Sequence, residues 1–355
     1  MDFETLKVQT EGAVLFAEIA VPPMNLLGPA LVRDLVTLIQ QAEGDEAIQV
    51  LVFRSADPDY FIAHVDVTRI AEYRDATTKL TGEPSLGLMF RYLSASRLVS
   101  IAQVEGRVRG AGSEFVLACD MRFAARESAI FGQPEAGLGL IPGAGGVQHL
   151  SRLLGRARAL EVMLSADDYD AELAERYGWI NRALPAQALA GFVRALAHRI
   201  AAFPAIGRVL VKERANAIGL APADDFRRDS QLFLEAGRNP ETQARSQAAM
   251  KRGLQTREAE MSLGRMLAAP REGSQFIVRS RARVTSALRS AGLPALGRLA
   301  RVKQPPPGCV GPQLRRAIRY LRYLLRLLEV GGSPRQSILV PPQRHRRFTL
   351  RGGLR

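Results

Sequence analysis

Two short, almost uninterrupted apolar runs, IQVLVF at residues 48–53 and VSIAQV at 99–104, limit most strongly what this chain can fold into. A strand with apolar side chains on both faces must be covered on both sides, as in a parallel sheet between helices. Another strand is predicted at residues 13–20, and a helix-period run that opens at Gly28-Pro29 separates it from residues 48–53. The sequence therefore predicts an α/β fold.

Helical periodicity dominates residues 156–255. Asn239 suits an N-cap and Pro240 the first helical position, so one helix is expected to begin there. Trp179 is predicted to be a packing residue, and the polar stretch from Arg74 to Pro84 to be mobile. The predicted helices are at residues 86–96, 171–177, 186–202, 205–218, 224–236 and 240–254.

Within residues 104–146, Glu114 and Glu135 stand beside glycine-rich turns in an otherwise mostly small and apolar run. The strand at 99–104 leads into a helix beginning near Ala111, and the N–H groups at a helix N-terminus suit a developing oxyanion. Burial would raise the pKa of Glu114 or Glu135 toward neutrality, where a carboxyl can both donate and accept protons. The alternative is that both glutamates are exposed turn residues.

The net charge of +14 is concentrated at the C-terminal end. Residues 280–355 hold 17 Lys and Arg against one acid, Glu329, whereas residues 1–279 hold 32 basic and 34 acidic residues. No nucleic-acid partner is therefore expected. The two cysteines, Cys119 and Cys309, form neither a disulfide framework nor a metal motif, and no leader or long apolar span is apparent, so a cytoplasmic location is expected.

The C-terminal tail is rich in Arg, Pro and Gly. Apolar residues from Leu314 to Leu328 recur at helical spacing with arginines on the other faces, a pattern that fits a basic amphipathic helix on an anionic membrane or an acidic partner. The same composition fits disorder, or a C-terminus translated out of frame from GC-rich DNA. We expect residues 259–355 to be a basic tail that is disordered or partly helical.

Seven segments, in this order, resemble the crotonase family, the enoyl-CoA hydratase/isomerase superfamily. They are Pro23-Met24-Asn25-Leu26, Phe61 to Asp66, Gly110 to Glu114, Cys119-Asp120, Phe131 to Glu135, Ile141 to Gly146 and Gly178 to Pro185. The resemblance covers about residues 6 to 258. It implies a spiral core of repeated ββα units at residues 1–200 and a helical C-terminal region at 201–258 that completes a homotrimer or hexamer. It also implies an acyl-CoA thioester as substrate.

The resemblance further implies roles for individual residues. In this family two backbone N–H groups bind the thioester oxygen, and here they correspond to those of Ala63 and Ala111. Such donors are typically worth ~3 kcal/mol each. Glu114 corresponds to the base that orients a water, and Glu135 to the acid that protonates the α-carbon. The implied substrate-binding residues are Ala63, His64, Asp66, Gly110, Pro134 and Gly143. Coenzyme A enters as part of the substrate, and no metal or permanently bound cofactor is implied.

Retention of both glutamates favours hydration, because family members that only shift a double bond often replace the first. The sequence therefore predicts an enoyl-CoA hydratase that adds water to a 2-enoyl-CoA. Three related activities stay open: a thioester isomerase, a decarboxylase and a thioester hydrolase. A further alternative is a catalytically idle member that acts through its basic tail.

Two positions depart from the family pattern. His64 occupies the usual glycine of the turn that supplies the first N–H donor, and we expect its side chain to be structural and to face solvent. A role in binding or acid–base chemistry is the alternative, since histidine titrates near neutral pH. Thr68 stands where a basic residue often holds the coenzyme phosphates. Arg69, Lys212 or the last helices are the candidates to replace it.

Overall fold

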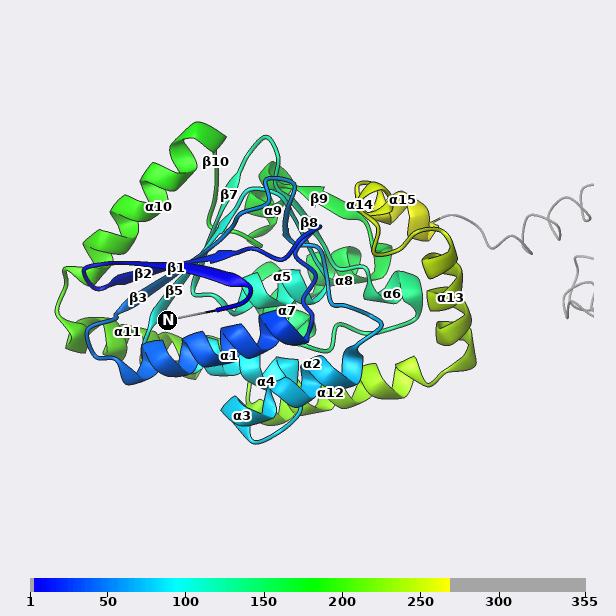
Figure 1. Cartoon of the computed structure of the whole chain (residues 1–355), viewed down its shortest axis with the longest axis horizontal. Helices are drawn as coiled ribbons and strands as arrows, with labels where there is room; N and C mark the ends of the chain where they lie inside the picture. Colours follow the sequence, from blue (N-terminus) through cyan, green and yellow to red (C-terminus); the bar gives the residue numbers. More distant parts are fainter. Residues whose placement is uncertain (1–2, 269–355) are drawn as a thin grey trace, which may run out of the picture. The chain divides into compact units, whose positions relative to one another are not determined.

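The computed structural model describes residues 3–268, which form one unit (Figure 1). The strands of this part are β1 (Leu6–Glu11), β2 (Val14–Ile19), β3 (Val50–Ser55), β4 (Tyr60–Ile62), β5 (Val99–Val104), β6 (Arg107–Arg109), β7 (Met121–Ala125), β8 (Ile130–Gly132), β9 (Asp168–Asp170) and β10 (Arg182–Leu184).

The helices of the same residues alternate with the strands at first and then follow one another. They are α1 (Pro29–Gly44), α2 (Ile70–Ala76), α3 (Thr78–Thr81), α4 (Leu86–Ala95), α5 (Ala111–Ala118), α6 (Glu135–Leu138), α7 (Gly146–Leu154), α8 (Arg156–Ser165), α9 (Ala171–Tyr177), α10 (Ala186–Ala201), α11 (Ala205–Gly219), α12 (Ala223–Gly237), α13 (Pro240–Lys251), α14 (Arg257–Glu260) and α15 (Leu263–Ala268).

The strands make two sheets whose strand orders follow the chain. The larger has the order β1-β2-β3-β5-β7-β10 and the smaller β4-β6-β8-β9. Except for the β1–β2 and β8–β9 pairs, all neighbours are parallel. The chain passes from β3 to β4, from β5 to β6 and from β7 to β8, so each passage adds one strand to each sheet before a helix follows. These are the repeated ββα units that the resemblance implied, and the α/β prediction is confirmed.

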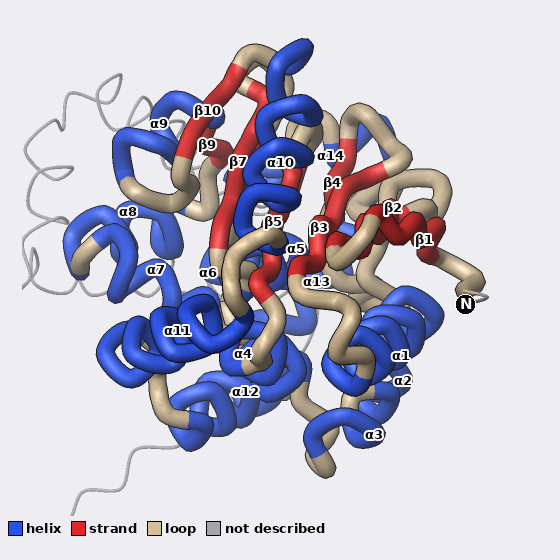
Figure 2. The backbone as a smooth tube through the Cα atoms, turned by 90° about the vertical axis from the view of Figure 1, so that its left-hand side faces the viewer, coloured by secondary structure: helices blue, strands red, loops and turns tan. Residues whose placement is uncertain are grey.

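The larger sheet is covered on both faces, as its apolar strands require. Leu51 and Phe53 of β3 belong to the main core with α1, α4 and α5. Val50 and Val52, which point the other way, belong to a second core with Leu189 and the rest of the buried face of α10. Figure 2 shows α10 lying along the sheet in front of β5 and β7. The apolar run at residues 48–53 was therefore interpreted correctly as a strand buried on both faces.

Most predicted elements lie within a few residues of the observed ones, and α9 coincides with its prediction. Trp179 is fully buried and its ring lies near those of Phe131 and Tyr169, as a packing residue should. The stretch from Arg74 to Pro84, predicted to be mobile, has regular local structure. That stretch contains α3, and the Thr77 hydroxyl, fully buried, binds the Arg74 and Glu83 carbonyl oxygens at 2.7 and 3.0 Å.

The helical C-terminal region continues beyond residue 258, where we expected the tail to begin. Helices α14 and α15 follow, and Leu263 and Leu267 of α15 are buried against Leu138 and Leu254. Helix α15 thus covers apolar side chains of α6 and of the segment after α13. The basic composition of residues 259–355 did not indicate that the first of them would pack in this way. The amphipathic helix suggested for residues 314–328 lies outside the described residues.

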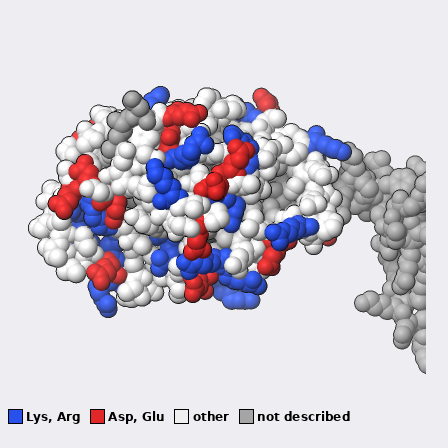
Figure 3. Space-filling model, turned by 60° about the horizontal axis from the view of Figure 1, so that its bottom comes forward, with Lys and Arg blue, Asp and Glu red and all other residues white. Residues whose placement is uncertain are grey.

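Within residues 3–268, no single helix is long and apolar enough to cross a bilayer, and α10 and α11 reach that measure only together, across a bend of 108°. Basic and acidic side chains are interspersed on the face seen in Figure 3. This distribution agrees with the near-neutral balance of residues 1–279.

The start of α5 depends on a glycine that lies against β4. A Cβ on Gly112 would stand 2.4 Å from the Ile62 carbonyl oxygen, whereas a Cβ on Gly191, exposed in α10, would contact nothing. We predict that Gly112→Ala lowers the free energy of unfolding by about 1–3 kcal/mol through overpacking. The matched Gly191→Ala change should raise it by about 0.5–1 kcal/mol. Denaturant unfolding of both variants tests this, and equal stabilities would contradict the packing argument.

Candidate active site

Glu114 and Glu135 line one cavity of about 720 Å³. Its walls come from the start of α5, from α6 and from α2, α12, α13 and α15. Leu86, Leu138, Leu140 and Phe233 contribute apolar surface beside the two carboxylates. Glu114 is 2% and Glu135 8% exposed, so the alternative of exposed turn residues is wrong.

Glu114 is held by the backbone of the glycine-rich run that leads into α7. Its Oε1 atom accepts hydrogen bonds from the N–H groups of Ala144 and Gly146, both at 2.8 Å. Gly146 is the first residue of α7, so this oxygen lies at a helix N-terminus. A Cβ on Gly146 would lie 3.1 Å from Glu114 Oε1 and 2.9 Å from the Pro142 ring, which explains why glycine suits this position.

Glu135 is the first residue of α6 and approaches Gly110 from the other side. Gln133 Nε2 donates to both of its carboxylate oxygens at 3.1 Å. Gly110 has a φ of 51°, and a Cβ there would stand 3.1 Å from Glu135 Oε1. A glycine is therefore favoured at residue 110 both by the backbone conformation and by the close approach of this carboxylate.

The two carboxyl groups share a proton-binding environment. Burial, followed by the charge of Glu135, raises the pKa of Glu114 despite its two N–H donors. Burial also raises the pKa of Glu135, against the hydrogen bond from Gln133 and the charge of His64. With both values raised and the groups close enough to interact, the pair retains a proton near neutrality.

The segments of Ala63 and Ala111 lie against each other. Ala111 is the first residue of α5, so its N–H group has no acceptor within the helix. Ala63 follows β4 directly and is fully buried, and Ile62 before it touches Gly112. Ala111 lines the cavity, whereas Ala63 contributes no lining surface.

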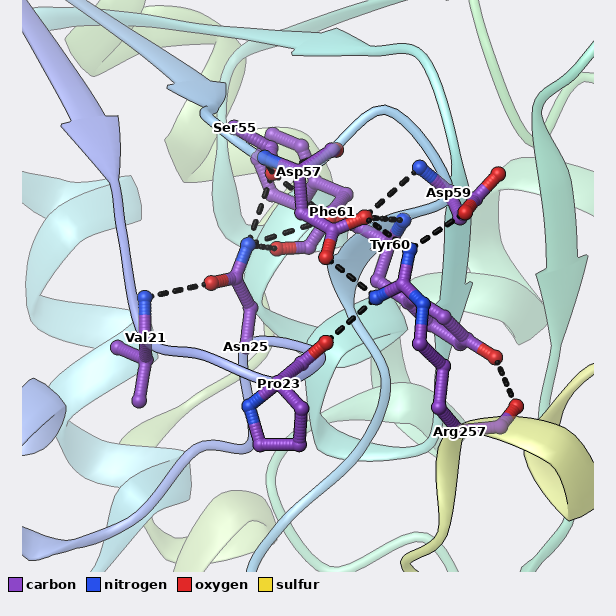
Figure 4. A network of polar contacts seen from close by, with 9 residues as sticks. All are labelled: Val21, Pro23, Asn25, Ser55, Asp57, Asp59, Tyr60, Phe61 and Arg257. Atoms are coloured by element: carbon purple, nitrogen blue, oxygen red, sulfur yellow. Dashed lines mark hydrogen bonds and ion pairs between the residues drawn. The ribbon is translucent and has the colours of Figure 1, made fainter.

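Asn25 holds the end of β4 in place (Figure 4). Its Nδ2 atom donates to the carbonyl oxygens of Tyr60 and Phe61 at 3.1 and 3.2 Å, and its Oδ1 atom accepts from the Val21 N–H at 2.7 Å. The Pro23-Met24-Asn25-Leu26 segment thereby supports the turn that contains Ala63.

The expectation that His64 faces solvent is wrong. The ring lines the cavity but is 6% exposed, with Nε2 2.8 Å from Glu260 Oε1 and Nδ1 2.6 Å from the Val65 carbonyl oxygen. Burial alone would lower the pKa of His64, but the hydrogen bond and charge of Glu260 outweigh it and raise the pKa above its usual value. An acceptor oxygen faces each ring nitrogen, an arrangement that suits a ring with a hydrogen on both nitrogens, paired with the carboxylate of Glu260 in α14.

The other expected substrate-binding residues divide into two groups. Gly110, Pro134 and Gly143 line the cavity. Asp66 does not: its Oδ1 atom accepts from the Thr68 N–H and hydroxyl at 3.0 and 2.6 Å, which closes the turn before α2. Asp66 is thus placed as a turn-forming residue.

The cationic residues of the cavity differ from those expected. Lys212 lies elsewhere, against a cavity of about 930 Å³, and pairs with Asp120 at 2.8 Å. Arg69 forms an ion pair with Glu72 on the surface and does not line the cavity. Besides His64, the basic side chains that line it are Arg74, Arg238 and Lys251, and no ion pair joins these three to an acid of residues 3–268.

Sequence reasoning also missed Tyr73 of α2, which is 2% exposed and lines the cavity. Burial and the charges of Glu114 and Glu135 raise its pKa, so the phenol is neutral beside the carboxylates. The helical spacing of residues 70–76 was hidden in a polar stretch, and no short motif marks Arg74, Arg238 or Lys251. Their meeting depends on how α2, α12 and α13 pack.

Comparison with known proteins agrees with this architecture. The family model described as enoyl-CoA hydratase/isomerase matches residues 9–258. A probable enoyl-CoA hydratase of Rhizobium meliloti is 32% identical over 66% of this chain and 90% of its own length. A short-chain-enoyl-CoA hydratase of Clostridium acetobutylicum is 30% identical over 61% of this chain and 82% of its own.

A solved structure is similar over nearly its whole length. The crystal structure of a Streptomyces avermitilis protein, provisionally named an enoyl-CoA hydratase, has 48% sequence identity and a TM-score of 0.75, with 76% of this chain and 99% of that chain covered. Sequence, fold and cavity agree that the chain belongs to the enoyl-CoA hydratase/isomerase family, the crotonase superfamily.

Proposed function

We propose that this enzyme adds water to the conjugated double bond of a 2-enoyl-CoA thioester. The observation that carries the proposal is a pair of buried carboxyl groups, Glu114 and Glu135, facing one largely apolar cavity beside the free N–H of Ala111. An apolar cavity suits an acyl chain, and two carboxyls that share a proton suit a reaction that takes one proton and gives another. The names of the hydratases described above support the same reaction class.

The backbone N–H groups of Ala63 and Ala111 would bind the thioester oxygen. Negative charge develops on this oxygen when the β-carbon is attacked, and fixed N–H dipoles stabilise it without reorganising. Water then supplies OH to the β-carbon while the α-carbon of the enolate takes up a proton. One carboxylate gains a proton and one carboxylic acid loses one, so the pair ends in the reverse protonation state and exchange with solvent restores it.

The roles of the two carboxyls follow the family positions that they match. Glu114 accepts two backbone N–H groups at the start of α7, and Glu135 accepts from the amide of Gln133 and from its own backbone N–H. Burial raises the pKa of both groups in spite of these donors, so the contacts alone do not order them. By its family position, Glu114 is the base that takes a proton from water, and Glu135 is the acid that protonates the α-carbon.

Arg74, Arg238 and Lys251 are the proposed contacts of the coenzyme A phosphates. All three line the cavity, and Arg238 and Lys251 are exposed to solvent. Guanidinium and ammonium groups are the usual partners of phosphate oxygens. In this arrangement the coenzyme A part of the substrate has its phosphates at the rim of the cavity and its thioester near Ala111.

A second copy of the chain is the proposed cover for α11. This helix has no buried residue, and its apolar side chains Ile206, Val211 and Ile218 are 67%, 71% and 85% exposed. Exposed apolar surface on this scale is typical of a protein interface. We therefore propose a homo-oligomer, a trimer or hexamer.

Activity tests the reaction directly. With crotonyl-CoA we expect loss of the conjugated thioester absorbance, and Glu114→Gln and Glu135→Gln should each lower kcat by about 100-fold or more because an amide cannot exchange the proton. Glu46→Gln, at an exposed position, is the matched control. Product analysis over a panel of thioesters separates hydration from isomerisation, decarboxylation and hydrolysis. Full activity in both glutamine variants would exclude the proposed roles.

The phosphate contacts predict an effect that depends on the coenzyme. Arg238→Ala should raise KM for crotonyl-CoA by about tenfold, the worth of one charged hydrogen bond, with little change in kcat. KM for the crotonyl-pantetheine thioester, which lacks phosphates, should stay unchanged. Arg252→Ala, an exposed arginine outside the cavity, is the control. An equal rise in KM for both thioesters would contradict the assignment.

Sedimentation velocity tests the oligomer. The unmodified chain should sediment as a trimer or hexamer, and Ile206→Glu should shift it to smaller species by placing a charge in the apolar contact. Arg214→Glu adds the same side chain at an exposed polar position of α11 and should leave the assembly intact. A monomeric wild-type chain at micromolar concentration would rule the interface out.

A further inference from the structure

A short segment near the C-terminal end of the described chain, residues 255–260, contacts the Ala63 turn on both sides. Its residues bind positions 57 to 60 before Ala63 and positions 64 to 67 after it. We propose that the 255–260 segment positions the Ala63 N–H for catalysis, with the His64–Glu260 ion pair as its central contact. The inference rests on the proposed hydratase function and assigns positioning residues to it.

Arg257 fixes the chain on the side before Ala63 (Figure 4). Its guanidinium binds Asp57 Oδ2 at 2.6 Å and Oδ1 at 3.1 Å, and it also binds Asp59 and the Pro23 carbonyl oxygen. The same group lies 4.9 Å from the centre of the Tyr60 ring, and the Tyr60 hydroxyl donates to the Arg257 carbonyl oxygen at 2.8 Å. Since Tyr60 begins β4, these contacts fix the start of the short strand that leads into the Ala63 turn.

Gln255 fixes the chain on the side after Ala63. Its Oε1 atom accepts from the Val67 N–H at 2.7 Å, and its Nε2 atom donates to Asp66 Oδ1 at 3.2 Å. The backbone N–H of Gln255 donates to Glu260 Oε1 at 3.1 Å. The side chain that holds the end of the turn is therefore connected to the carboxylate that holds His64.

The His64–Glu260 pair lies between these two anchors. Glu260 is fully buried, and its Oε2 atom has no hydrogen-bond partner within residues 3–268. Because Nδ1 of His64 faces the Val65 carbonyl oxygen, Nδ1 must carry a hydrogen, and the charged ring donates from Nε2 as well. The charged groups that face the ring are Glu260, Glu135 and Arg109, the last of which is paired with Asp168.

The position of the ring explains its effect on the site. A Cβ on Gly110 would lie 3.5 Å from His64 Cβ and 3.1 Å from Glu135 Oε1, so the imidazolium, the start of α5 and the acid are neighbours. With Tyr60 and His64 both held, Ala63 cannot shift alone. A misplacement of about 1 Å in such a site costs on the order of 100-fold in rate. A fixed cation here also stabilises the negative charge that develops on the thioester oxygen.

Glu260→Gln is the decisive variant. Glu260 Oε1 accepts from both the imidazolium and the Gln255 N–H, and the amide oxygen of glutamine can accept the same two hydrogen bonds, but it carries no charge to stabilise the imidazolium. We expect kcat for crotonyl-CoA to fall at least about tenfold with KM within about twofold. In this variant kcat should also fall further as pH rises through the lowered pKa of His64. Glu258→Gln, the same change at an exposed position of α14, should match the wild type at every pH.

A chromophoric ligand gives a readout that needs no turnover. The absorption of 4-dimethylaminocinnamoyl-CoA shifts to the red when its thioester carbonyl is polarised. The wild-type protein should bind it with a red shift, and Glu260→Gln should bind it about equally well with a smaller shift. A change in melting temperature accompanied by a wild-type red shift and a wild-type pH profile of kcat would mean a structural role only, and would overturn the proposal.

Two further results separate the possible failures. If Glu260→Gln does not fold, Gln255→Ala takes its place: it removes the contacts to Asp66 and Val67 but retains the ion pair, and should lower kcat and the red shift to a smaller degree. Unchanged values in that variant would also overturn the proposal. A wild-type chain that neither binds the chromophore nor hydrates crotonyl-CoA would refute the hydratase function, and the positioning role with it. Binding with equal shifts in all variants would refute only the positioning role.

Discussion

The close approach of Ile62 to Gly112 determines the geometry of everything around it. It joins the end of the smaller sheet's first strand to the N-terminus of α5, two segments separated by about fifty positions in the chain. Gly110, with its positive φ, then turns the backbone so that Ala111 starts the helix beside Glu135. Glu114 follows within the first turn of α5 and reaches the start of α7. The residues of the site are therefore brought together by the ββα units themselves, at the points where strands end and helices begin.

Local patterns predicted those parts of the molecule that local physics determines. The apolar runs at 48–53 and 99–104 correspond to β3 and β5, since any strand so apolar must be covered on both faces. The motif around Glu114 and Glu135 predicted their neighbourhood because both lie beside glycines that the turns require. The short strands β4, β6 and β8 were not predicted, because three residues carry too little periodicity to be recognised.

The failures have a common physical cause. His64 looked like a surface residue because its partner, Glu260, lies 196 positions away and in a stretch that composition assigned to the tail. Lys212 looked like a phosphate ligand, yet its ammonium is satisfied by Asp120, 92 positions away. Where a charged side chain lies in a fold depends on its ion-pair partner. When the partner is far away in the sequence, residue spacing does not indicate it. Resemblance to a family helps only where the motif includes both members of the pair.

The His64–Glu260 pair shows why such contacts belong to function. Removing two charges from water costs several kcal/mol per ion, and the attraction between them often fails to recover that cost. Apolar residues at both positions would stabilise the fold equally well. The buried pair is better explained by its effect on the site, because it fixes the position of the turn and places a charge beside it. Here the family match ends at residue 258, two residues before Glu260, while His64 lies well inside it. Loss of either partner leaves an uncompensated buried group, so His64 and Glu260 are expected to change together or not at all. The C-terminal segment is in this respect part of the same functional unit as the turn it holds.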